Sequence, residues 1–160
     1  MAVKEQRAEL SNVSADAGYD ADFFQWTQTT AEMIRQGRLA EVDLEHVAEE
    51  IEDMGKRDRR EARSRFSVLI MHLLKWQLQP ERRERSTWRA TIKEQRKQLR
   101  LVLADSPSLG RIPREELPAL FRSAVEDAVE ETGLSADHFP SSCPYSAEQI
   151  LASNFFPEGR

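Results

Sequence analysis

Hydrophobic residues recur along most of the chain at the three- and four-residue spacing that is typical of an α-helix. No segment shows the sustained alternation that indicates a β-strand. Together with capping residues and breakers, the pattern predicts helices over residues 20–36, 43–54, 64–79, 86–104, 118–131 and 146–152. The predicted N-caps are Asp20, Asp43 and Ser86, and Gly37 and Gly133 are expected to end helices. Ser146 and Gln149 have the spacing of a capping box. We therefore expect an all-α fold, a single-domain bundle of four to five main helices with a short C-terminal helix.

The segment 64–79 is hydrophobic around most of its circumference, which predicts a central helix. The stretch before it, 56–65, follows Gly55 and has Ala62 as its one apolar residue. It is either a solvent-facing helical link or a kink, so the continuity of the helix through Gly55 is left open. Residues 1–18 are polar and unpatterned, and we expect a flexible tail there, a helical domain over 19–157 and a short tail over 158–160.

The formal net charge of −5 conceals a segregation of charge along the 160 residues. Residues 1–55 carry 4 basic and 13 acidic side chains, residues 56–100 carry 15 and 5, and residues 101–160 carry 4 and 10. Because acidic segments flank the basic one within a small chain, we expect acidic and basic helices to pair internally. The basic segment also contains Trp76 and Trp88, and arginine with aromatics suits single-stranded nucleic acid, so nucleic-acid binding through 56–100 is a third functional hypothesis.

The sequence argues against several classes of protein and of functional site. The longest strongly apolar stretch, 68–74, is far short of the roughly 20 residues that span a bilayer, and the N-terminus has no apolar signal-peptide core. A cytoplasmic protein without a membrane partner is therefore expected. The single Cys143 excludes an internal disulfide framework and a multi-cysteine zinc site. Its proximity to His138 in sequence does not predict a nucleophilic pair.

A metal site on the acidic helix is also weakly indicated. His46, Glu49 and Glu50 have the spacing of helical metal ligands, but His46 and Glu49 point away from the apolar stripe. We predict no catalytic residue, no metal site and no cofactor. Only Glu50 and Asp43 border the stripe closely enough to be half-buried, and Glu50 is a candidate pocket residue.

The more informative constellation lies between two predicted helices. If 64–79 and 86–104 form an antiparallel hairpin about 80–85, His72 comes level with Gln95 and Gln77 with Arg89. Buried polar groups without partners cost about 1–3 kcal/mol each, so these side chains must form either a structural network or a ligand pocket. Both alternatives stay open, and the candidate pocket residues are Glu50, His72, Trp76, Gln77, Trp88, Arg89, Gln95 and Arg96.

Six segments in order carry a family resemblance: DLEHVAEEIEDMG, HLLKWQLQPERR, TWRATIKEQR, DSPSL, ETGL and FPSSCPYSAEQIL. From about residue 19 to residue 157 the chain resembles the bacterial domain-of-unknown-function family 29. The resemblance implies a small, largely helical protein and implies no activity. Where the family pattern is expected to read Leu-Glu-Asn, this chain reads Leu44-Glu45-His46.

The function is therefore unknown at this level, and the leading hypothesis is a cytoplasmic, non-enzymatic binding or interaction domain. Its partner would be a protein or a small ligand, and self-association into a homo-oligomer is left open. The alternative is a metal- or small-ligand-dependent enzyme that uses the polar pocket around His72 and Gln95.

Overall fold

The computed structural model describes residues 18–159, and all regular secondary structure in that range is helical. The all-α prediction is thus confirmed. The chain divides after Gly55 into two compact units, residues 1–55 and 56–160, which are described separately below. The tails predicted at 1–18 and 158–160 lie outside the described residues except for Gly18, Glu158 and Gly159. The single domain predicted for 19–157 stays a prediction.

The first unit contains the helix α2 (Phe23–Arg35), the short 3-10 helix η1 (Leu39–Glu41) and the beginning of α3 (Leu44–Leu78). The sequence pattern placed the first cap at Asp20, which was wrong. Residues 18–21 already form a helical turn, and the Asp22 carboxylate accepts a hydrogen bond from the Gln25 backbone N–H at 2.9 Å. At the other end, Gly37 adopts a φ of 72°, a left-handed conformation that ends the helix as predicted.

Helix α3 runs without interruption through Gly55, which answers the question that the sequence left open. The Asp43 carboxylate caps its start by accepting hydrogen bonds from the backbone N–H groups of Glu45 and His46. The residues after Gly55 are mainly Lys, Arg and Glu, which favour helix strongly enough to offset the roughly 1 kcal/mol cost of one glycine. The two predicted helices 43–54 and 64–79 are therefore parts of one helix.

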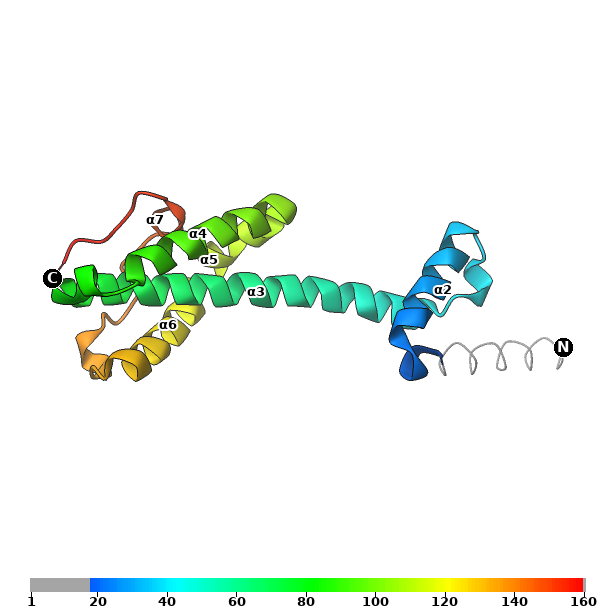
Figure 1. Ribbon diagram of the computed structural model, residues 1–160, viewed down its shortest axis with the longest axis horizontal. Helices are drawn as coiled ribbons and strands as arrows, with labels where there is room; N and C mark the ends of the chain where they lie inside the picture. Colours follow the sequence, from blue (N-terminus) through cyan, green and yellow to red (C-terminus); the bar gives the residue numbers. More distant parts are fainter. Residues whose placement is uncertain (1–17, 160) are drawn as a thin grey trace. The chain divides into compact units, whose positions relative to one another are not determined.

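In the second unit, α4 (Trp88–Asp105) returns antiparallel to the end of α3 after the 3-10 turn η2 (Pro80–Arg85), as Figure 1 shows. The predicted cap Ser86 donates to the Arg83 carbonyl instead, and Thr87 precedes the helix without a side-chain cap. The remaining elements are η3 (Pro107–Arg111), α5 (Ile112–Glu115), α6 (Leu117–Thr132), η4 (Ala136–His138) and α7 (Ala147–Leu151).

Helix α6 packs on α3 in a parallel direction. The Ser67 hydroxyl donates to the Leu120 carbonyl at 3.3 Å, and further along both helices in the same direction Lys75 pairs with Glu131. Between α4 and α6, the second half of α3 supplies the core of this unit. The fully buried side chains include Phe66, Leu69, Ile70, Leu73, Leu74, Ile92, Leu99, Leu120 and Ile150.

Ion pairs connect the basic segment of α3 with the acidic segment after residue 101. Arg59 and Arg63 contact the two carboxylate oxygens of Glu116, at 2.6 Å and 3.0 Å. Both arginines are largely exposed, and such surface pairs contribute at most about 1 kcal/mol each. Within this unit the charge segregation therefore does lead to internal pairing, while the hydrophobic core supplies most of the stability.

Candidate functional site

The C-terminal segment fills the groove between α3 and α4 that the sequence suggested as a pocket. The Phe156 ring lies 5.1 Å from the Trp76 ring, and the guanidinium groups of Arg89 and Arg96 lie 5.6 Å and 5.5 Å from Phe156. The structure thus brings Trp76, Arg89 and Arg96 together, but around an aromatic side chain of the same chain.

Arg96 is 1% exposed and binds the end of α7. Its Nε donates to the Ile150 carbonyl at 2.9 Å and its Nη2 to the Gln149 carbonyl at 3.4 Å, while Nη1 has no partner. A cation is favoured at a helix C-terminus because the last carbonyls carry partial negative charge. Burial lowers the Arg96 pKa to about 10, and the nearby charge of Arg100 adds to this effect.

The two glutamines of the predicted pocket have separate partners. Gln77 accepts a hydrogen bond from the Tyr145 hydroxyl at 2.8 Å. Gln95 accepts one from Arg65 at 3.5 Å, two helical turns before His72 on α3. Gln95 is therefore bonded to Arg65, and His72 is bonded to Val68, so the predicted pairing of Gln95 with His72 is not the one that forms.

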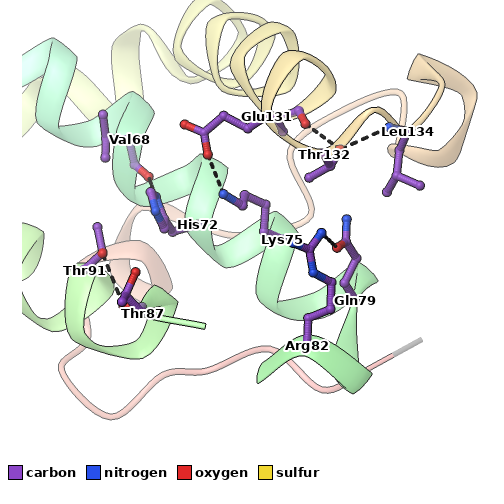
Figure 2. Close-up of polar contacts among 11 residues, drawn as sticks. Val68, His72, Lys75, Gln79, Arg82, Thr87, Thr91, Glu131, Thr132 and Leu134 are labelled. Atoms are coloured by element: carbon purple, nitrogen blue, oxygen red, sulfur yellow. Dashed lines mark hydrogen bonds and ion pairs between the residues drawn. The ribbon is translucent and has the colours of Figure 1, made fainter. Parts of the chain in front are cut away.

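His72, Lys75 and Gln79 instead form a buried polar stripe at the end of α3, where Gln79 follows the last helical residue and the spacing i, i+3 and i+7 keeps the three on one side. The His72 Nδ1 lies 2.8 Å from the Val68 carbonyl, which fixes a tautomer with the proton on Nδ1 (Figure 2). Burial is the main cause that lowers the pKa of His72 below its usual 6.5.

Lys75 joins this stripe to α6 and α4. Its Nζ pairs with the Glu131 carboxylate at 2.5 Å, as Figure 2 shows, and lies 5.0 Å from the Trp88 ring centre. The hydrogen bond from Lys75 lowers the pKa of Glu131. A lysine that is 7% exposed needs such a partner, because an unpaired buried charge is strongly unfavourable. These contacts support a structural role for the stripe.

In the first unit, Glu50 accepts a hydrogen bond from the Tyr19 hydroxyl at 2.5 Å. This bond is the main cause that raises the Tyr19 pKa to about 12. The Tyr19 ring stacks on His46 at 4.2 Å and meets the edge of Trp26 at 4.9 Å. Tyr19 therefore joins α2 to the start of α3. The hydrophobic pattern did not indicate this role, because Tyr19 stands between the predicted tail, 1–18, and the predicted helix, 20–36.

The surface of the first unit is unusually apolar. Trp26 is its one buried hydrophobic residue among the described positions, whereas seven large hydrophobic side chains are exposed. These are Phe23 (48%), Phe24 (72%), Ile34 (42%), Leu39 (53%), Leu44 (58%), Ile51 (64%) and Met54 (60%). The sequence pattern predicted inward faces for several of them, whereas in the structure their side chains are exposed.

Leu44 and Ile51 lie seven residues apart and therefore share one face of α3. At 3.6 residues per turn, this face is roughly opposite the one through which His46 and Glu50 contact Tyr19. The exposed stripe on α3 is thus distinct from the packed side of the same helix. We call the exposed side chains of Leu44 and Ile51 the α3 stripe.

Other chemistry is sparse in residues 18–159. No cluster of three or more His, Cys, Asp or Glu in this range could hold a metal ion. The Cys143 thiol is half-buried, and burial raises its pKa. Among the described helices, none combines the length and the apolar character required to cross a membrane.

The fold and these contacts define an all-α protein whose buried polar groups are bound mainly by internal partners. The chain belongs to the family described as domain of unknown function DUF29, whose model matches residues 19–156. No curated protein and no solved structure matches the chain. The suspected family is confirmed, and membership assigns no activity.

Proposed function

We propose that this protein is a non-enzymatic interaction module, and that the first unit docks a cationic amphipathic helix of another protein. The observation that carries the proposal is the set of seven exposed large hydrophobic side chains in residues 18–55, a stretch in which Trp26 is the one buried hydrophobic residue. Exposed apolar patches of this kind mark interaction surfaces more often than chance would place them. We also propose a cytoplasmic location, supported by the free Cys143 thiol.

The charge of the first unit indicates the chemistry of the partner. Residues 18–55 contain ten acidic and two basic side chains. Both basic residues already pair locally, Arg35 with Glu32 and Arg38 with Glu41. Exposed Glu45, Glu49 and Glu52 lie on the same helix as the α3 stripe. A helix with leucines on one face and lysines beside them complements both features.

A second copy of this chain is a poorer fit to the same surface. The first units of two copies would bring acidic surfaces together, which is unfavourable. In the described part of the second unit, Leu101 is the one exposed large hydrophobic residue, so the basic surface there has little apolar area to contribute. The charge pattern therefore favours a different protein as the partner.

The test uses the full chain and a synthetic 18-residue peptide that forms a leucine–lysine amphipathic helix. Fluorescence anisotropy of the labelled peptide measures the dissociation constant. We expect Ile51→Glu to weaken binding about tenfold or more, because burial of one isoleucine contributes about 1.5–3 kcal/mol. The matched control is Leu101→Glu, which makes the same kind of change at a comparably exposed position in the second unit.

Three outcomes would contradict the proposal. The peptide could fail to bind, or a scrambled peptide of the same composition could bind equally well. Equal weakening by Leu101→Glu and Ile51→Glu would show that the α3 stripe is not the docking surface. A dimer seen in sedimentation of the full chain and lost in Ile51→Glu would identify a second copy as the occupant instead.

A further inference from the structure

A cavity of about 740 Å³ opens where the chain turns from α3 into α4, in the second unit. This volume is in the range of small-molecule sites, which are about 300–1,000 Å³. Its walls come from η2, from the two residues that follow it and from the first residue of α4, and they consist of Glu81, Arg82, Arg85, Ser86, Thr87 and Trp88.

Arg82 is held in place at this cavity before any ligand arrives. Its Nη1 donates to the Gln79 side-chain oxygen at 2.8 Å, as Figure 2 shows, and Gln79 is 6% exposed. The Arg82 guanidinium also lies 5.5 Å from the centre of the Trp88 ring. A donor that is already oriented loses little conformational entropy when it binds, so it contributes more to affinity.

The remaining lining groups add positive charge and hydroxyls. Arg85 is exposed and makes no ion pair with any described residue. Ser86 and Thr87 contribute side-chain hydroxyls, which can donate to an anion. From Lys75 to Arg89 the chain has five basic and two acidic side chains, so the local field is positive. The N-terminus of α4 adds positive partial charge from the helix dipole, and no acidic residue in its first turn offsets that charge.

Glu81 is the one carboxylate in the lining, and it favours a ligand that carries a hydrogen-bond donor. A simple inorganic anion would form no favourable contact with this carboxylate. A ligand hydroxyl, in contrast, would donate a hydrogen bond to its oxygens. Two guanidinium groups with hydroxyls suit the several oxygens of a phosphate group, which arginine binds through paired N–H donors.

We propose that this cavity binds a small phosphate monoester that also carries hydroxyl groups. Arg82 and Arg85 bind the phosphate oxygens, Ser86 and Thr87 donate to them, and Glu81 accepts from a hydroxyl of the organic part. The ligand belongs to the soluble class, because the lining has one large apolar residue, Trp88, and Trp88 is 6% exposed.

Isothermal titration calorimetry of the full chain at low salt tests the proposal with glucose 6-phosphate as the probe, and with glucose and inorganic phosphate as comparisons. We expect glucose 6-phosphate to bind, inorganic phosphate to bind more weakly and glucose not to bind. Arg85→Gln should weaken glucose 6-phosphate at least tenfold without affecting the fold, since Arg85 makes no ion pair there. Arg82→Gln should also weaken glucose 6-phosphate binding at least tenfold. Arg57→Gln, an exposed arginine outside the cavity, is the matched control.

Failure of glucose 6-phosphate to bind at millimolar concentration would overturn the proposal. An equal loss in Arg57→Gln would overturn it too, because the effect would then come from general charge. Tighter binding of a single-stranded DNA oligonucleotide or of vesicles containing phosphatidic acid, lost in Arg82→Gln and Arg85→Gln, would assign the cavity to a different class of ligand. Normal circular dichroism of each variant excludes unfolding as the cause.

Discussion

Replacing Arg96 tests how a buried cation is accommodated beneath the C-terminal segment. The fall of its pKa from the usual arginine value to about 10 corresponds to about 3 kcal/mol of unfavourable free energy for the charged form. Hydrogen bonds to charged groups contribute about 1.5–3 kcal/mol each, and Arg96 makes two, to Ile150 and Gln149. The two bonds therefore offset the cost of burying the charge, and the net contribution of Arg96 to stability comes mainly from its packing.

Two variants separate these contributions. Arg96→Ala leaves a cavity under Phe156 and removes both bonds, so the free energy of unfolding should fall by about 3–5 kcal/mol. Arg96→Met fills most of the volume and removes the buried charge, so the loss should be about 0–2 kcal/mol. Urea denaturation followed by circular dichroism measures both values. Equal losses in the two variants, or a loss below about 1 kcal/mol for Arg96→Ala, would refute this account.

Three further predictions follow from local contacts. The unfolded chain binds more protons than the folded one between the lowered pKa of His72 and 6.5, so stability should rise with pH through this window. Urea denaturation at about pH 5 and about pH 7.5 should show a smaller difference in His72→Gln than in the wild type, and an unchanged difference in the exposed-site control His138→Gln. In a spectrophotometric titration, Glu50→Gln should lower the Tyr19 pKa from about 12 toward 10, and no change would exclude the Tyr19–Glu50 bond as the cause. Thermal denaturation should show that Gly133→Ala, at a φ of 71°, loses about 1 kcal/mol, whereas Gly55→Ala within α3 gains up to about 1 kcal/mol, and the same sign in both would contradict the assignment.

Local signals in the sequence predicted most of the secondary structure. Asp43, Gly37 and Gly133 were recognised as helix boundaries because their caps and left-handed conformations depend on nearby backbone alone. The capping box of Ser146 and Gln149 was recognised for the same reason. Gly55 was ambiguous, since a single glycine in a charged stretch costs a helix too little to decide between a link and a kink.

The candidate site was less predictable because it depends on contacts between distant residues. The structure places Trp76, Arg89 and Arg96 around the Phe156 ring, and nothing local to these three residues in the sequence indicates that ring. Nothing in the sequence pattern indicated that the side chains of Ile51 and Leu44 are exposed. An amphipathic pattern predicts a face that needs burial, and it does not say whether the burying surface belongs to the same chain.

The dependence of the second unit on its final residues has a consequence for synthesis on the ribosome. Phe66 and Leu99 are in the core, but Ile150 and Phe156 complete the packing around Arg96. At about 5–20 residues per second, the roughly 90 residues from Phe66 to Phe156 take on the order of 5–20 s to translate. Throughout that interval the nascent α3 and α4 lack their final cover, so this is the period in which the growing chain is most exposed to chaperones and to aggregation.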